Sequence, residues 1–100
     1  MYQDLLSIGS VVQLKGTEAK LMITGRILSD EKMEKIYDYC GVIYPMGITS
    51  ENTQYFFNRD DIETVYHVGY IGEEELAFKK EVLSKLGELE IVDGRIEEKG

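Results

Sequence analysis

The hydrophobic pattern of the chain changes its period once, at Gly69–Gly72. Before this point the apolar residues fall into short runs rich in β-branched and aromatic side chains, which are typical of strands. After it they recur at a helical spacing. Because strands precede a single helix, we expect an α+β fold, with a strongly bent antiparallel sheet of about five strands packed on one C-terminal helix. A partly open barrel is the alternative.

The expected strands occupy the first two thirds of the chain. They are residues 11–15, 19–28, 36–44, 53–57 and 62–68. The first two are close enough to form a hairpin across Gly16. Gly25 interrupts the apolar face of the second strand, which predicts a bulge or a close approach by another element. The connector at 29–35 is expected to be an exposed loop or one helical turn, and 50–52 a turn.

A C-terminal helix is expected to follow Gly72, where Glu73–Glu75 place negative charge in its first turn. Its apolar stripe consists of Phe78, Val82, Leu86 and Leu89, with Leu83 beside it and Leu76 at its edge. We expect this stripe to cover a sheet face and Gly87 to end the helix. The sequence thus predicts one domain at 1–87, followed at 88–100 by a charged C-terminal tail or a short hairpin.

The acidic composition limits the partners of the chain. Eleven Lys and Arg residues against nineteen Asp and Glu give a net charge of -8, which repels nucleic-acid backbones and anionic lipid surfaces. The first residues carry an acid where a signal peptide requires positive charge, and no apolar run approaches the length of a membrane span. The single cysteine fits a reducing compartment. We therefore expect a cytoplasmic protein that binds neither nucleic acid nor membrane.

No combination of residues typical of catalysis is found in the sequence. Asp60 and Asp61 follow Asn58, and this string matches a turn or a helix cap better than an acid–base pair. His67 has no nucleophile with a paired signature, and the apolar surroundings of Cys40 are typical of a buried, inert thiol. One His and one Cys are too few for a usual zinc site, and the glycines form no phosphate-binding loop. We expect no enzyme activity, no cofactor and no metal.

Tyrosines are the most suggestive residues for an interaction site. The chain has seven tyrosines and no tryptophan. Tyrosine is enriched at protein interfaces because its ring is a broad apolar face and its hydroxyl a polar tip. The candidate interaction residues are Tyr44, Met46, Tyr55, Tyr66 and Tyr70. The alternative is that the aromatic residues fill the sheet core and its margins.

Several blocks of the sequence resemble one known family. They are residues 5–16 (LLSIGSVVQLKG), 20–26 (KLMITGR), 37–47 (YDYCGVIYPMG) and 55–62 (YFFNRDDI), followed by Val65 and by Gly69-Tyr70 ahead of the acidic helix. Over about residues 5–85, the chain resembles the domain-of-unknown-function family four-one-seven-six, small proteins of Gram-positive bacteria.

The resemblance implies a partner rather than a chemistry. Members of this family are typically encoded beside LXG-type polymorphic toxins and type VIIb secretion genes, and the family has no catalytic residues. The resemblance therefore implies a cytoplasmic accessory protein that binds a cognate LXG-type toxin, or another secreted effector, as a targeting factor or chaperone. An edge strand could take up a toxin segment, or a tyrosine-rich face could hold a helix of it. The alternatives are an immunity protein and, last, an enzyme of unknown type; a homo-oligomer is compatible with each.

Overall fold

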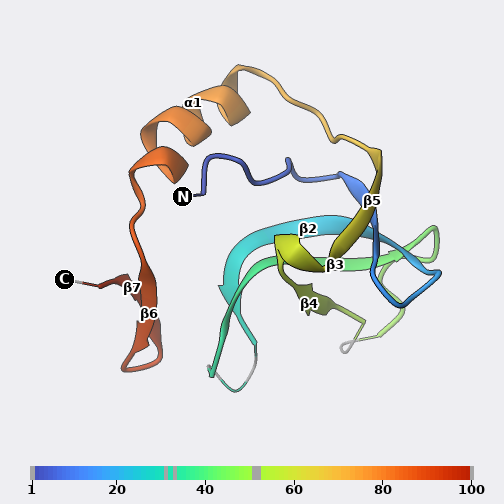
Figure 1. Ribbon diagram of the computed structural model, residues 1–100, viewed down its shortest axis with the longest axis horizontal. Coiled ribbons are helices and arrows are strands. Elements are labelled where there is room, and N and C mark those ends of the chain that lie inside the picture. The colour runs from blue at the N-terminus through green and yellow to red at the C-terminus, as the bar shows by residue number, and fades with distance from the viewer. Residues whose placement is uncertain (1, 31, 33, 51–52, 100) are drawn as a thin grey trace.

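The computed structural model describes residues 2–30, 32, 34–50 and 53–99 (Figure 1). Its main sheet has five antiparallel strands in the order β4-β3-β2-β1-β5. The strands are β1 (Val11–Leu14), β2 (Lys20–Ser29), β3 (Ile36–Tyr44), β4 (Tyr55–Phe57) and β5 (Ile62–His67). The predicted α+β class and five-stranded antiparallel sheet are confirmed. The connectors expected at 29–35 and 50–52 include residues 31, 33, 51 and 52, which lie outside the described residues.

The two edge strands, β4 and β5, are joined directly through the 3₁₀ helix η1 (Arg59–Asp61). In a flat sheet, four strand spacings would separate these strands by about 19 Å. The link cannot reach that far, because a 3₁₀ helix rises only about 2 Å per residue. The sheet is therefore strongly bent, as Figure 1 shows for β2 and β3. Because β4 and β5 do not pair with each other, the described strands form a curled open sheet and no closed barrel.

The hydrophobic core combines side chains from the strands with the N-terminal segment. Its buried members are Leu5, Val12, Leu21, Ile23, Tyr39 and Phe57. Leu5 is fully buried although it precedes the first strand. The Tyr39 hydroxyl accepts a hydrogen bond from the Leu6 backbone N–H at 2.9 Å, and burial raises the pKa of the Tyr39 phenol. The N-terminal segment is thus part of the core and is held to it by a hydrogen bond.

Gly25 lies at an irregularity in β2, as the sequence predicts. The register between β2 and β3 shifts between Ile23 and Gly25. A Cβ atom on Gly25 would lie 2.8 Å from the Sγ atom of Cys40, which is itself buried. The close approach of β3 therefore explains why a residue without a side chain occupies this position.

The C-terminal helix differs from the expected one. Helix α1 (Glu73–Glu81) has nine residues, none of them buried, and a 3₁₀ turn η2 (Leu83–Lys85) follows it. The predicted apolar stripe is wrong, because Phe78, Val82 and Leu76 are exposed and Leu89 belongs to a later strand. Leu83 alone among the predicted helix residues that the structure describes is buried. Figure 1 shows α1 above the N-terminal segment rather than on the sheet.

The last part of the chain folds as a hairpin of β6 (Leu89–Val92) and β7 (Arg95–Glu98), which form a separate two-stranded sheet. Asp93 and Gly94 both have positive φ angles, of 50° and 75°, as a two-residue type I′ turn requires. Strand β6 contacts β3. Within the described ranges, no helix is long and apolar enough to cross a membrane.

Candidate protein-interaction surface

Gly69, in the connection between β5 and α1, is held tightly against the N-terminal segment. The hydroxyl of Ser7 donates to the Gly69 carbonyl at 2.9 Å, and the Gly69 N–H donates to the Ser10 hydroxyl at 3.0 Å. Both serines are buried. A Cβ atom on Gly69 would lie 2.1 Å from the Ile8 carbonyl oxygen. Only glycine allows the two backbone segments to approach this closely.

The residues beside this anchor expose apolar side chains. Val68 and Tyr70 flank Gly69 and are 49% and 85% exposed. Ile71 and, on the N-terminal segment, Ile8 are 46% and 45% exposed. Because Gly69 is fixed by two buried hydrogen bonds, these side chains stay in solvent as a result of the fold and not of local unfolding. Grouped exposed apolar side chains mark interaction sites more often than single ones do.

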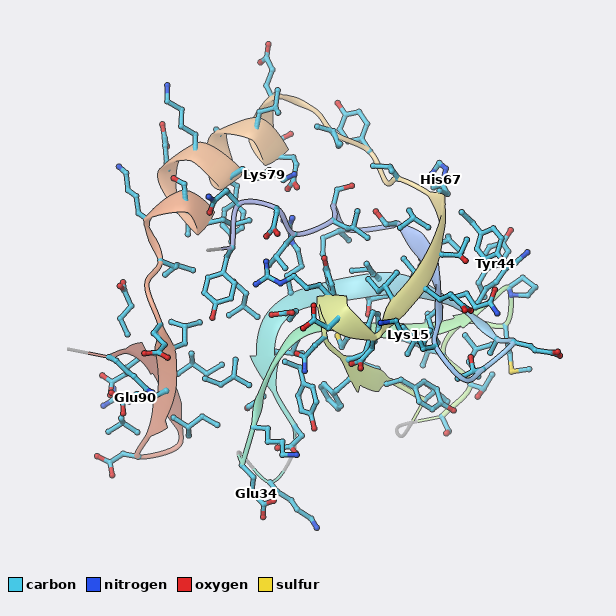
Figure 2. All side chains as sticks on the ribbon, viewed as in Figure 1. Lys15, Glu34, Tyr44, His67, Lys79 and Glu90 are labelled. Atoms are coloured by element: carbon cyan, nitrogen blue, oxygen red, sulfur yellow. The ribbon has the colours of Figure 1, made fainter. Side chains whose placement is uncertain are left out.

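A shallow hollow adjoins these residues on the outer side of the sheet. Its lining consists of Gly9, Val11, Lys20, Met22, Tyr44, Tyr66 and His67. The Tyr66 ring lies 4.5 Å from the Lys20 Nζ atom, and its hydroxyl donates to Gln13 Oε1 at 2.6 Å. Tyr44 and His67 point outward on the same side of the molecule (Figure 2). Two half-exposed tyrosine rings therefore flank an apolar floor.

The hollow and the exposed apolar residues adjoin each other along the chain. Gly9 and His67 line the hollow, and they are the chain neighbours of Ile8 and Val68. We call this surface the tyrosine surface and define it by Ile8, Tyr44, Tyr66, His67, Val68, Tyr70 and Ile71. It extends from the end of β3 across the end of β5 to the start of α1.

The structure places two of the five candidate interaction residues in one hollow and a third beside it along the chain. Tyr44 and Tyr66 line the same hollow, and Tyr70, three residues along the chain from His67, lines a second hollow with Arg26, Glu74 and Phe78 at the start of α1. Tyr55 lines a third hollow, formed with Leu14, Leu21 and Ile43 among others. Met46 is exposed in the connection after β3. All five side chains are exposed. Sequence reasoning missed the aliphatic members, because isolated isoleucines and valines look like core residues. Their one signal was that each precedes a glycine in the sequence, namely Gly9, Gly69 or Gly72.

The residues weighed for catalysis are placed apart. Asp61 accepts a hydrogen bond from the Asn58 N–H at 2.8 Å and donates its own N–H to the Asn58 carbonyl at 2.9 Å, so the predicted turn and cap is confirmed. Asp61 directly precedes β5, whereas His67 ends this strand. The aspartates and the histidine therefore lie at opposite ends of β5.

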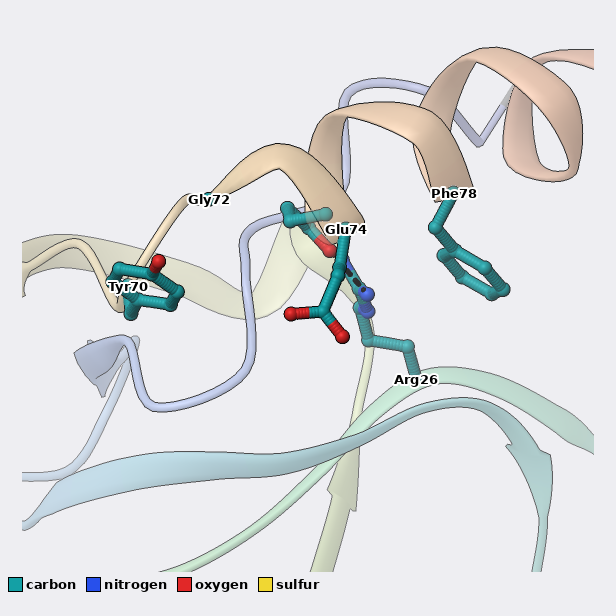
Figure 3. A pocket seen from close by; sticks show the side chains of 6 residues that line it. Arg26, Tyr70, Gly72, Glu74 and Phe78 are labelled. Carbon is teal, nitrogen blue, oxygen red and sulfur yellow. Dashed lines mark hydrogen bonds and ion pairs between the residues drawn. The ribbon is translucent and has the colours of Figure 1, made fainter.

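An ion pair anchors α1 at the other end of the surface. The Arg26 guanidinium donates to both carboxylate oxygens of Glu75, at 2.7 and 2.8 Å, and to the Leu6 carbonyl at 3.3 Å. The Arg26 and Glu75 side chains are only 9% and 11% exposed. Figure 3 shows Arg26 extending from β2 toward the first turn of α1, with Tyr70 and Phe78 on either side. The hydrogen bond from Arg26 lowers the pKa of the Glu75 carboxyl.

This ion pair makes part of the stability depend on pH. Because the folded pKa of Glu75 is lowered, its stabilisation is present above the ordinary value of 4.5 and is lost as the pH falls through the folded value. Glu75→Gln is therefore expected to lower the free energy of unfolding by a constant amount around neutral pH and by a smaller amount below pH 4.5. Urea unfolding of both proteins between neutral pH and pH ~3 measures this difference. An equal difference at both ends would contradict it.

Comparison with known proteins finds a match to the family model described as Domain of unknown function (DUF4176), over residues 5–78. This range covers the five-stranded sheet and continues into α1. No curated protein and no solved structure matches the chain significantly.

Proposed function

Because the chain belongs to the DUF4176 family, we propose that it is a non-enzymatic cytoplasmic accessory protein that binds a cognate LXG-type toxin and acts as a targeting factor or chaperone for type VIIb secretion. The gene neighbourhood implied by the family resemblance supports this class of partner. The observation that carries the binding role is the tyrosine surface.

The tyrosine surface supports a protein partner through its exposed apolar side chains and its rigidity. Covering a large apolar side chain contributes about 1.5–3 kcal/mol, and tyrosine is among the residues that dominate interface energies. Tyr70 is 85% exposed, so it contributes almost nothing to the core of the free protein. The Gly69 anchor holds the surrounding backbone in place before a partner binds, which reduces the ordering cost of binding.

The sheet edges support binding through side chains rather than through strand addition. β4 has three residues and offers little edge. The ladder between β5 and β1 has irregularities between Val11 and Val12 and between Gln13 and Leu14. Short and bulged edge strands disfavour pairing with a further strand. Of the two binding modes that the sequence left open, the tyrosine-rich face is therefore favoured.

A pull-down with the toxin encoded beside this protein tests the proposal. The full-length toxin, its LXG half and its toxic half are each offered to the immobilised protein. We expect capture of the full-length toxin and of the LXG half, together with loss of toxin export when the gene is deleted. Absence of capture with normal export after deletion would overturn the proposal. Capture through the toxic half, with protection of cells that express it, would assign the immunity role instead.

A further inference from the structure

We propose that the tyrosine surface receives an amphipathic helix of a protein partner, and that basic residues of this helix lie at the α1 end of the surface. The inference deepens the proposed function and rests on it only in taking a protein as the partner. It names the chemistry of the partner segment and its direction on the surface.

The α1 end of the surface is acidic. Glu73 and Glu74 directly follow Ile71 and Gly72 and are exposed. Among the described residues, neither of them takes part in an ion pair, whereas the charge of neighbouring Glu75 is neutralised by Arg26. Two uncompensated carboxylates therefore border the apolar side chains of Tyr70 and Ile71, and they attract cationic side chains of a partner.

The hollow at the other end has a different charge. Its lining contains Lys20 and His67 and no carboxylate. A partner helix that carried basic residues along its whole length would place some of them next to Lys20. The favourable arrangement has the apolar side chains in the hollow and basic residues beside Glu73 and Glu74 only. The charge difference along the surface thus gives the bound helix a direction.

A helix fits this surface better than an extended segment. An extended segment must satisfy its backbone N–H and C=O groups on the protein, and both main edges are poor templates for this. A helix satisfies its own backbone and needs only apolar contacts for its side chains at i, i+3, i+4 and i+7. The net charge of -8 further favours encounter with a cationic segment.

Two model peptides provide a test that does not require the toxin. One is an amphipathic helix of about 18 residues, five turns long, built from leucine with lysines on the polar face near one end. The other carries glutamate in place of each lysine. Amide chemical shifts of the full chain are recorded during each titration. We expect the lysine peptide to shift the amides of Ile8, Tyr66–Ile71 and Glu73–Glu74, and the glutamate peptide to bind at least about tenfold more weakly.

Matched variants separate this site from general attraction to an acidic protein. Tyr70→Ala is expected to weaken binding of the lysine peptide about tenfold or more. Tyr55→Ala, which removes a 47% exposed ring from another hollow, is expected to change it less than about twofold. The double variant Glu73→Gln, Glu74→Gln is expected to weaken peptide binding several-fold at low salt. The control is the double variant Glu90→Gln, Glu97→Gln in the hairpin, which removes the same amount of charge. The Tyr70 and Glu73 side chains are exposed, so these variants should fold.

Several outcomes would overturn the inference. They are equal affinity for both peptides, chemical shift changes centred on Tyr55, equal effects of the test and control variants, and a homodimer in solution that Tyr70→Ala dissociates, which would assign the surface to a second copy. The toxin experiment remains separate. If the peptides behave as expected but the toxin is not captured, the proposed function fails and the helix site stands. If the toxin is captured equally by wild type and Tyr70→Ala, the helix site fails and the function stands.

Discussion

Gly69→Ala is expected to lower the free energy of unfolding by about 3 kcal/mol or more. The added Cβ atom would lie 2.1 Å from the Ile8 carbonyl oxygen and 2.9 Å from the Gly9 carbonyl carbon, both backbone atoms that cannot rotate away. The connection must therefore move off the N-terminal segment. This movement breaks the hydrogen bonds to two buried serines, and each buried polar group left without a partner costs about 1–3 kcal/mol. Urea unfolding measures the change.

Two further variants make this expectation specific. Gly87→Ala is the matched control, because its Cβ atom would meet only the Glu98 Oε2 atom, at 3.5 Å, and a change within about 0.5 kcal/mol is expected. Ser10→Ala removes the acceptor of the Gly69 N–H without a clash, and about 1–3 kcal/mol is expected to be lost. If Gly69→Ala were no more destabilising than Gly87→Ala, the anchor would not hold the connection.

Arg26→Met is expected to lower the free energy of unfolding by about 2–3 kcal/mol and to release α1. The substitution keeps most of the apolar stem of the side chain but removes both hydrogen bonds to Glu75 and the one to the Leu6 carbonyl. Glu75 would then be a nearly buried carboxylate without a cation. Because α1 has no buried residue, the helix can turn outward to hydrate this carboxylate. Because of this movement, the expected loss of stability is smaller than the loss on breaking a fully buried ion pair.

A double-mutant cycle tests the ion pair directly. Arg26→Met combined with Glu75→Leu replaces both charges by apolar groups and is expected to recover at least about half of the stability that Arg26→Met loses. Amide hydrogen exchange of Glu73–Glu81 should accelerate in Arg26→Met much more than exchange in β2 and β3. Unchanged exchange in α1 would show that other contacts hold the helix, and additive losses in the double variant would show that the two side chains are not coupled.

The main sheet could be predicted from the sequence because its signals are local. Alternation and β-branched residues identified β2 and β3, and the long apolar run 36–44 coincides with β3 as observed. Gly25 was predicted to mark a bulge or a close approach, and it lies at the register shift against Cys40. The residue type at such positions depends on the backbone immediately around them. Local sequence therefore carries most of the information about them.

The helix shows where local patterns were insufficient. Periodicity identified a helix after Gly72 and predicted that Phe78 and Val82 would face the sheet, but both are exposed. The ion pair that joins α1 to β2 is formed by Arg26 and Glu75, which are 49 positions apart. The Arg26 side chain is only 9% exposed, although it carries a full positive charge. A pairing between distant residues leaves no periodic signal in either segment.

The sequence by itself determined the fold class and the strands of the main sheet, and it predicted a set of tyrosines as candidate interaction residues, because composition and alternation depend on neighbouring residues. The tertiary structure decided which of these residues act together. Ser7 and Ser10 fix Gly69 across the fold, and this contact joins Tyr66 and Tyr70 with Ile8 on one surface while leaving Tyr55 on another. Hydrogen bonds between distant segments decide which side chains are buried and which remain available to a partner, and no single stretch of sequence contains both halves of such a bond.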